Sequence, residues 1–174
     1  MFVGRKMADT GVVTIDLDEG QARILGAMIG FDDAYLNAGF FEQDTETDER
    51  GEAKSLAEIA AIQEFGAPKA SIPERSFMRS TFDAHEDDYT QAASEALGSV
   101  IDGDITPMGA MIEVGERMSG DMRLTIYDMK TPPNAPSTIA RKGFNDPLVH
   151  TGTMARTLRY VAVLGEETLE QAKG

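Results

Sequence analysis

Hydrophobic and polar residues repeat along this chain with two different periods, which predict strands near both ends and helices between them. β-branched and apolar residues dominate 12–17, 34–41 and 157–164, and this composition predicts three strands. Apolar residues at helical spacing predict helices at 19–29 and 55–66. The predicted strands therefore lie on both sides of a helical middle.

Two longer segments predict a helical hairpin. Residues 74–101 place alanines and other apolar residues on one helical face, and the turn Asp102-Gly103-Asp104 ends this helix. Thr106 and Pro107 then provide a helix cap and a first-turn proline for a second helix. Its apolar face is rich in methionine, which fills irregular gaps and predicts core packing, with a partner subunit as the other reading. The face consists of Met108, Met111, Gly115, Met118, Met122 and Met129.

Together these elements predict an α+β fold in one domain, 1–174. We expect a small, mainly antiparallel sheet of 12–17, 34–41 and 157–164, packed against the long helical hairpin. A length of 174 residues is sufficient for one domain with a substantial core. The segment after Gly165 reads as a frayed helix.

Two irregular segments interrupt the regular elements. Residues 42–54 contain almost no apolar side chain, so nothing there offsets the entropy of ordering, and we expect a flexible acidic loop. In 130–150, Pro132, Pro133 and Pro136 fix φ and lack an N–H donor, which disfavours pairing inside a sheet. A short helical turn and basic residues follow these prolines. We therefore expect 130–150 to be an extended docking arm.

Charge is unevenly distributed along the chain. The net charge is −14, with twelve acids against four bases in 1–52 but five bases against one acid in 130–160. Such a two-ended distribution suits contact between copies or attraction to a charged partner, although solubility alone would also account for it. The overall acidity argues against gripping DNA through its phosphates, which requires clustered Lys and Arg.

Little in the sequence indicates catalysis or cofactor binding. The chain has no cysteine, and its two histidines, His85 and His150, do not form a paired zinc motif. Glycine-rich phosphate loops and a serine nucleophile elbow are absent. No apolar run approaches the roughly 20 residues that span a bilayer. We therefore expect a non-enzymatic protein without metal, cofactor or membrane contact.

Six charged residues are candidates for contact with a partner or another subunit. Glu64 ends one predicted helix and Arg75 begins the next, so both point into one corner, as solvated charges, as an ion pair or as a subunit contact. Arg141 and Lys142 fit the end of a short helix, where cations are favoured by the helix dipole, or contact with an acidic neighbour. The full set is Glu64, Arg75, Arg141, Lys142, Arg156 and Arg159.

Two segments of the sequence resemble a known family. The first is SLAEIAAIQEFGAPKASIPERSFMRSTFD at 55–83, and the second is TPPNAPSTIARKG followed by PLVHTGTMARTLRY within 130–163. They resemble the neck and tail-completion (minor tail) proteins of long-tailed bacteriophages and cover more than a third of the chain. The chain departs from the family pattern at Ser76, where a second proline is common, and at Val149-His150, where an apolar-acidic pair is expected.

The resemblance implies a structural protein of the phage neck or tail that joins head to tail and has no active site. It implies a homo-oligomeric ring, six-fold or twelve-fold, between head-connector proteins and tail terminator or tube proteins. Genomic DNA would pass through the ring without sequence-specific binding. The protein would be made in the bacterial host cytoplasm and located in the virion.

Two other classes remain open from the residues alone. The acidity is compatible with a DNA-mimicking inhibitor of a DNA-processing enzyme, although its densest acidic run lies in the loop that we expect to be flexible. The second is an enzyme whose site has no recognisable motif. Salt-sensitive binding to a DNA-processing enzyme would favour the first class, and turnover by the purified protein the second.

Overall fold

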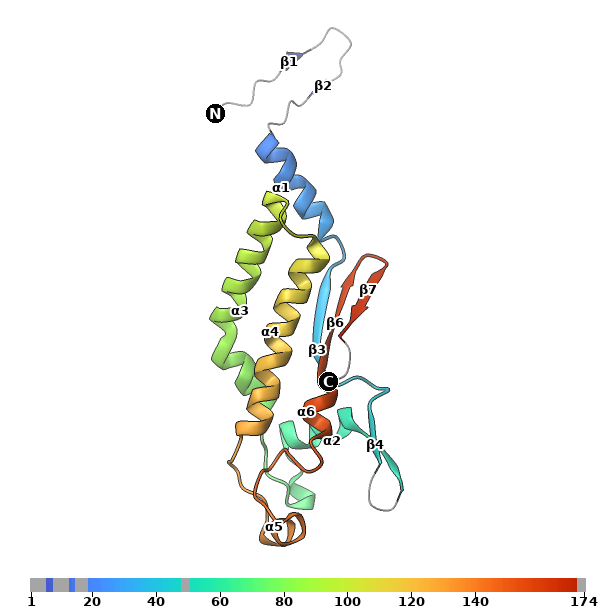
Figure 1. Ribbon diagram of the computed structural model, residues 1–174, viewed down its shortest axis with the longest axis vertical. Coiled ribbons are helices and arrows are strands. Elements are labelled where there is room, and N and C mark those ends of the chain that lie inside the picture. The colour runs from blue at the N-terminus through green and yellow to red at the C-terminus, as the bar shows by residue number, and fades with distance from the viewer. Residues whose placement is uncertain (1–5, 8–12, 15–18, 48–50, 172–174) are drawn as a thin grey trace.

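Two long helices pack against each other as a hairpin, and a narrow sheet lies along one side of this hairpin (Figure 1). The computed structural model describes residues 6–7, 13–14, 19–47 and 51–171. The fold is α+β, as predicted. In chain order its elements are β1 (Lys6–Met7), β2 (Val13–Thr14), α1 (Glu19–Gly30), β3 (Tyr35–Gly39), β4 (Thr45–Thr47), β5 (Ala53–Ser55), α2 (Leu56–Phe65), the 3-10 turn η1 (Pro68–Ala70), α3 (Phe77–Asp102), α4 (Pro107–Asp128), α5 (Pro136–Lys142), α6 (Thr153–Thr157), β6 (Arg159–Leu164) and β7 (Glu167–Glu170).

Local capping signals set the helix boundaries where the sequence predicts them. The Ser55 hydroxyl accepts a hydrogen bond from the Glu58 N–H at 3.4 Å and caps α2. Thr106 caps α4 in the same way, through the Gly109 N–H at 3.0 Å. Gly103 ends α3 in the left-handed conformation, with φ 84°. The predicted helical hairpin is confirmed.

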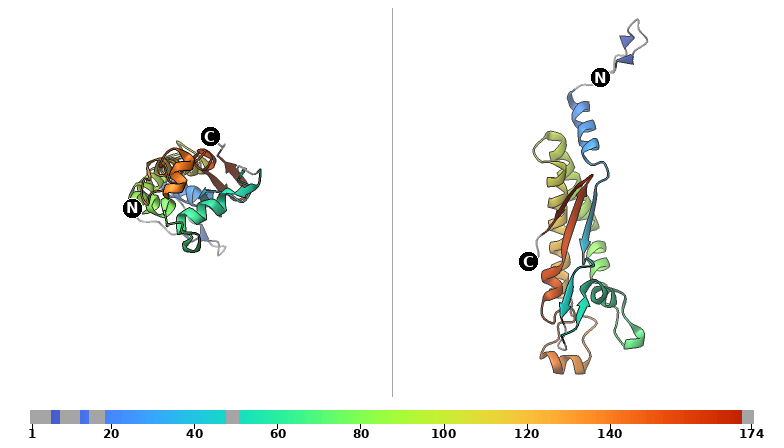
Figure 2. Two further views of the ribbon diagram at one scale, coloured as in Figure 1. Left: turned by 90° about the horizontal axis from the view of Figure 1, so that it is seen from below. Right: turned by 90° about the vertical axis from the view of Figure 1, so that its right-hand side faces the viewer.

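The main sheet has three strands in the order β3-β6-β7, and all its pairs are antiparallel. β6 is the central strand, with Tyr160 opposite Ala38 and Ala162 opposite Leu169. The right-hand view of Figure 2 shows this sheet as a layer along the hairpin. The predicted pairing of 34–41 with 157–164 is confirmed.

Two predicted details of the sheet are wrong. The strand predicted at 12–17 is not in the main sheet: its described part, Val13–Thr14, pairs only with Lys6–Met7 in a separate ladder, and residues 12 and 15–17 lie outside the described residues. The segment after Gly165 is not a frayed helix, because Glu167–Glu170 pairs with β6 as β7. Pairing with a buried strand here outweighs the helix preference of an acidic segment.

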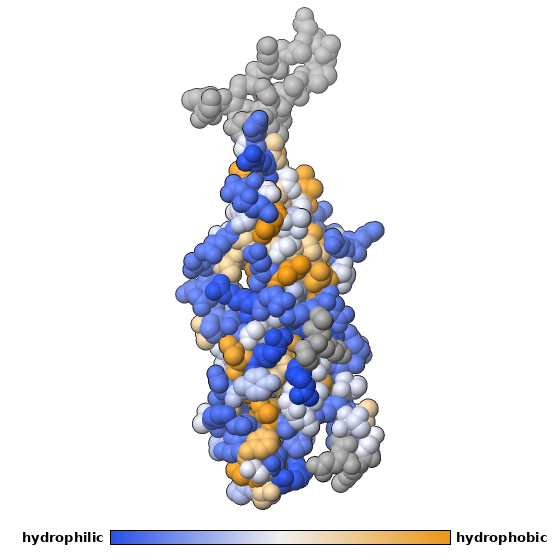
Figure 3. All heavy atoms as spheres, in the orientation of Figure 1, coloured by the Kyte–Doolittle hydropathy of each residue, from blue (hydrophilic) through white to orange (hydrophobic). Residues whose placement is uncertain are grey.

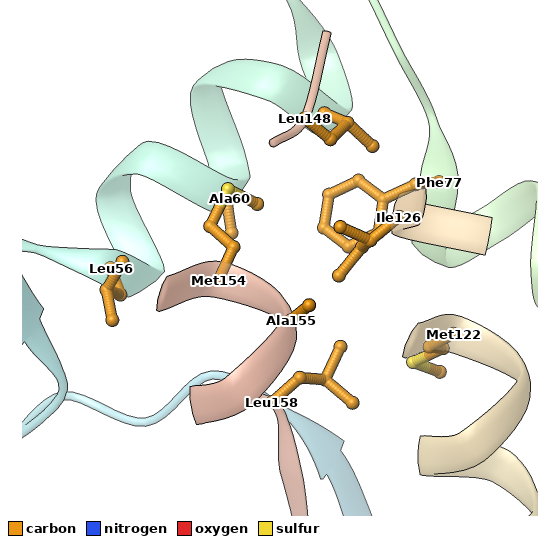
Figure 4. Packing of buried hydrophobic residues seen from close by; sticks show 9 residues of the cluster. All are labelled: Leu56, Ala60, Phe77, Met122, Ile126, Leu148, Met154, Ala155 and Leu158. Atoms are coloured by element: carbon orange, nitrogen blue, oxygen red, sulfur yellow. The ribbon is translucent and has the colours of Figure 1, made fainter. Parts of the chain in front are cut away.

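One hydrophobic cluster joins four helices and the arm at the α5 end of the hairpin. Phe77 and Ile126, from the two hairpin helices, lie next to each other, with Leu148 of the arm above them at the edge of the cluster (Figure 4). The helices α2 and α6 close the cluster on the opposite side. Its buried members are Leu56, Ala60, Phe77, Met122, Ile126, Leu148, Met154, Ala155 and Leu158.

A second cluster attaches the sheet to α4. Met108 and Met111 pack against Tyr160 and Ala162 of β6, so the methionine face of α4 is core, as predicted. Gly115 lies directly beneath the Tyr160 ring: a Cβ atom at this glycine would be 2.6 Å from ring carbons. The close approach of α4 to β6 therefore depends on glycine, which has no side chain, at position 115.

This contact predicts opposite effects for two glycines of one helix. Gly115→Ala should lower the free energy of unfolding by about 1–3 kcal/mol, because the added methyl group overpacks the interface with Tyr160. Gly120→Ala is the control, since a Cβ there meets no atom within 4 Å, and it should stabilise the helix by up to about 1 kcal/mol. Urea unfolding measures both changes. Equal stability of the two variants would contradict this packing.

Candidate interaction surfaces

Arg159, predicted as a contact residue, is buried in the protein's own interior. Its side chain is fully buried and pairs with the equally buried Asp44 at 2.5 Å. Glu170 of β7 forms a second ion pair, and the guanidinium lies 4.6 Å from the centre of the Phe41 ring. The residue therefore holds the sheet to the segment that follows β3, and is not available to a partner in this conformation.

The acidic segment 42–54 is partly ordered by this same cluster. Asp44 is fully buried, and its carboxylate also accepts the Phe41 N–H at 2.9 Å. Further along, Thr45–Thr47 and Ala53–Ser55 pair as an antiparallel hairpin. The expectation that nothing in 42–54 offsets the entropy of ordering is wrong for these residues, because the charge of Asp44 is neutralised by Arg159 inside the protein. Residues 48–50 lie outside the described ranges.

Glu64 and Arg75 are both buried, but their side chains do not form an ion pair with each other. The Glu64 carboxylate accepts the N–H groups of Met78 and Arg79, at 2.9 and 3.1 Å, in the first turn of α3. It also pairs with the Arg79 side chain at 2.9 Å. This side-chain bond to Glu64, with a second one to Glu74, raises the pKa of Arg79. Glu64 thus caps the long helix from the preceding corner.

Arg75 attaches the proline arm to this corner. Its Nε donates to the Pro132 carbonyl at 2.9 Å and its Nη2 to the Pro133 carbonyl at 3.0 Å. The third bond, 2.7 Å long, goes from Nη1 to the side chain of Gln63. Burial lowers the pKa of Arg75. The arm is therefore fastened at its base by Arg75, for which the sequence had left open a solvated charge, an ion pair or a subunit contact.

The rest of the arm folds back on itself. The Asn145 side chain accepts the Asn134 N–H at 3.0 Å, and Lys130 pairs with Asp146 at 2.5 Å. Beyond them, Leu148 enters the core cluster. These contacts turn 130–150 into a closed loop at the end of the molecule that carries α5 (Figure 1).

Three of the candidate residues, all cations, lie near the surface of the arm and of α6, and their contacts differ. Arg141 is exposed and makes no hydrogen bond or ion pair with the described residues. Lys142 is half-buried, donates to the Asp146 carbonyl at 2.7 Å and lies over the Phe144 ring; burial lowers its pKa. Arg156 is exposed and donates to the Thr151 carbonyl at 3.0 Å. Arg141 is thus the candidate most open to a partner.

An apolar groove of about 440 Å³ lies between β3 and α2, and we name it the β3–α2 groove. Small side chains of α2 form one wall. Phe65, at its edge, is 64% exposed, which is high for a large apolar side chain. Sequence reasoning missed this groove, because it depends on the distance between two elements. The groove's apolar lining includes Phe40, Ala57, Ala60, Ala61, Phe65 and Met78.

The described residues do not bring the histidines into a ligand cluster. His85 Nδ1 lies 3.2 Å from Asp88 on an exposed helix face, whereas His150 lines a separate small hollow beside α6. Among the described residues, no group of three or more His, Cys, Asp or Glu is placed to hold a metal ion. Over the same residues, every helix is too short or too polar to cross a bilayer.

Comparisons of the chain with protein-family models, with curated proteins and with solved structures found no match.

Proposed function

We propose that this protein is a structural subunit of the neck or tail of a long-tailed bacteriophage, assembling as a homo-oligomeric ring around the DNA channel. One observation carries this proposal. The segments that resemble the phage family, 55–83 and 130–163, lie far apart in sequence but meet through Arg75 and the core cluster. The two resembling segments therefore lie together in one part of the structure. This part includes residues 130–150, the loop that carries α5, which we name the α5 loop.

The two-ended charge distribution supports assembly through this unit. Arg141 and Lys142 lie in the last turn of α5. Acidic residues are exposed at the opposite end of the hairpin, where Asp102 and Asp104 flank its turn. Contacts between unlike ends are heterologous, and such contacts close into rings when the rotation permits. Head-connector and tail terminator or tube proteins are the neighbours that this function requires.

A charge reversal at the α5 loop tests the proposal. Because Arg141 is exposed and makes no hydrogen bond or ion pair with the described residues, Arg141→Glu should change stability by less than about 0.5 kcal/mol. Its incorporation into phage particles should fall about tenfold, the effect of about 1.4 kcal/mol on assembly. Lys142 is left unchanged, since it also holds the loop through Asp146.

Quantitative labelling of the protein in purified particles measures this effect. Arg117→Glu, an equal charge change at an exposed position of α4, is the matched control and should be incorporated normally. Normal incorporation of Arg141→Glu would contradict the docking role of the loop. Absence of the unmodified protein from finished particles would contradict the proposed function itself.

A second candidate function is a DNA-mimicking inhibitor, which one structural feature favours. Asp83, Glu86 and Asp87 are exposed on α3, so these acids are held on a regular helix and not only in the acidic loop. A DNA-binding site could engage such a row through its cations. Inhibition of a DNA-processing enzyme that high salt abolishes, and that Glu86→Lys with Asp87→Lys removes, would support this function.

A further inference from the structure

The outer edge of β3 carries backbone groups that no described strand pairs with. β3 comes first in the strand order β3-β6-β7, so one of its edges is free. The Gln171 N–H donates to the Tyr160 carbonyl at 3.1 Å, so the backbone groups of Tyr160 and of every second residue of β6 point to β7. Ala38 lies opposite Tyr160, and the N–H and C=O groups of Ala38 and Leu36 therefore point away from β6. These groups make no hydrogen bond with the described residues.

This edge also lacks the features that keep strands of different molecules apart. Charged residues and prolines on an edge strand prevent unwanted pairing. Of the edge strands among the described residues, β1, β4, β5 and β7 each contain a charged residue, whereas β2 and β3 contain none. The sheet is therefore protected along β7, by Glu167 and Glu170, and unprotected along β3.

The space beside the unprotected edge is open. The β3–α2 groove lies along residues 37–41, and Tyr35, at the other end of the strand, is 53% exposed. Figure 3 shows hydrophobic atoms at the surface where α1 and the sheet meet. An extended segment that adds main-chain hydrogen bonds to an exposed strand edge is a recurrent mode of recognition. The free backbone groups of β3 therefore suit a strand as their partner.

The ladder of β1 and β2, which we name the β1–β2 ladder, lacks a neighbouring strand of its own. Lys6–Met7 and Val13–Thr14 pair only with each other among the described residues. An isolated two-stranded ladder is marginally stable in water, and further strands stabilise it. β1 contains Lys6, so β2 is the uncharged edge of the ladder. Pairing of β2 with β3 would leave Lys6 at one border of the enlarged sheet and the acids of β7 at the other.

The sequence around β2 suits a strand with one covered face. Every second residue from Val13 to Leu17 is apolar, and the polar Thr14 and Asp16 lie between them. Successive side chains of a strand point to opposite faces, so this pattern gives one apolar and one polar face. β3 has the same arrangement, since its inward side chains pack in the cluster beneath α4 whereas Asn37 is exposed. The two strands therefore match in the pattern of their faces.

Helix α1 keeps the β1–β2 ladder of one chain away from its own β3. The 12 residues of α1 extend over about 18 Å between these elements. Figures 1 and 2 place β1 and β2 beyond one end of α1, and β3 beyond its other end. With α1 in this conformation, the ladder reaches the free edge of β3 only in a second copy.

We propose that β2 of one copy pairs with the outer edge of β3 of a second copy and so extends the sheet of that copy. Each copy gives its ladder to one neighbour and its β3 edge to another, which is a heterologous contact of the kind that forms rings. This contact rests on the proposed function in requiring several copies, and it adds the surfaces that join them. Both surfaces are distinct from the α5 loop, which remains available to other virion proteins.

Disulfide trapping tests the pairing residue by residue, because the natural chain contains no cysteine. Asn37 is exposed and lies between the two residues whose backbone points outward, so it faces the added strand at a non-hydrogen-bonded position, where opposite residues come closest. Full-length Asn37→Cys is mixed with full-length variants that carry one cysteine each at positions 12 to 17, and each mixture is mildly oxidised. The best of Val12→Cys, Thr14→Cys and Asp16→Cys should give at least about tenfold more mixed dimer than its two neighbouring positions, because only alternate residues of a strand share a face.

Charge placed on the edge tests the same contact without cysteine. Tyr35→Lys with Asn37→Lys gives β3 a protected edge and should weaken self-association by more than about tenfold, measured by native mass spectrometry across a concentration series. Leu124→Lys with Tyr127→Lys, at exposed positions of α4, is the control with equal added charge and should leave self-association unchanged. Equal weakening by both pairs would overturn the contact, since added charge alone would then explain the effect.

The outcomes distinguish the contact from the function. Oligomers whose trapping yield does not alternate along 12–17 would overturn strand pairing and leave the phage function standing. Alternating yields in a protein absent from virions would support the pairing and contradict the function. A monomer that closes a disulfide between Thr14→Cys and Asn37→Cys within one chain would show that β2 joins its own sheet, and would overturn the contact. A protein that remains monomeric at every concentration tested would overturn it as well.

Discussion

The substitution Arg159→Met is expected to lower the free energy of unfolding by about 3–5 kcal/mol, the largest effect that we predict for a single side chain. The guanidinium and the Asp44 carboxylate are both fully buried, so removing the cation takes from a buried acid the opposite charge that it is paired with. Methionine keeps much of the side-chain volume, and the loss is therefore mainly electrostatic. Urea unfolding followed by circular dichroism measures it.

Two further variants identify the cause of this loss. Arg156→Met removes an exposed arginine three residues away and should change stability by less than about 0.5 kcal/mol. Asp44→Asn combined with Arg159→Met should be more stable than Arg159→Met alone, because the buried charge is then absent. If all three variants unfold at the same urea concentration, the buried ion pair does not hold the sheet in place.

This ion pair illustrates what the sequence left undecided. The alternation of Leu158, Tyr160, Ala162 and Leu164 correctly predicts a strand and its buried face, and it places Arg159 on the other face. That face is also covered, since Asp44 and Phe41 lie against it from a segment 115 residues away. Periodicity reports the local backbone, whereas burial of the second face depends on which distant segment covers it.

The helices α1 to α4 were predictable because their signals are local, whereas the five-residue helix α6 was not predicted and its last residue, Thr157, was assigned to the strand. The caps at Ser55 and Thr106 and the turn at Gly103 lie within a few residues of the boundaries that they set. The strand β7 was not predictable in this way, because its acidic sequence is stabilised by pairing with β6. The exposure of α1 was equally hidden, since an amphipathic helix has the same pattern whether or not the rest of the chain covers its apolar face.

The corner between α2 and α3 was located correctly, but its bonds were not. The sequence brings Glu64 and Arg75 together, and both lie there. Each nevertheless bonds to other groups, Glu64 to the first turn of α3 and Arg75 to the arm. Arg79 could have been anticipated as the partner of Glu64, because it lies one helical turn from Arg75 on the same helix-entry segment. The contact with Pro132, across 57 residues, has no signal in the sequence.

The second large effect is expected for Arg75→Met, which should lower the free energy of unfolding by about 2–4 kcal/mol. This side chain donates three hydrogen bonds, two of them to carbonyls of the arm. Hydrogen bonds to a charged group contribute about 1.5–3 kcal/mol each, and the loss is expected to be smaller than their sum because the freed carbonyls of the arm can bond to water when the arm opens. The loss should be concentrated in 130–150. Hydrogen–deuterium exchange of peptides from this segment, beside peptides from α4, measures how far the arm opens.

Arg75→Lys and Arg141→Met complete the test of the arm. Lysine retains the charge but lacks the planar fork that spans both proline carbonyls, so its effect should be intermediate. Arg141→Met changes an exposed cation of the same loop and should leave exchange unaltered. Under the proposed function, Arg75→Met should also reduce incorporation into particles although Arg141 is intact, because the loop that presents Arg141 is no longer held. Unchanged exchange in 130–150 would mean that the core contact of Leu148 alone positions the arm.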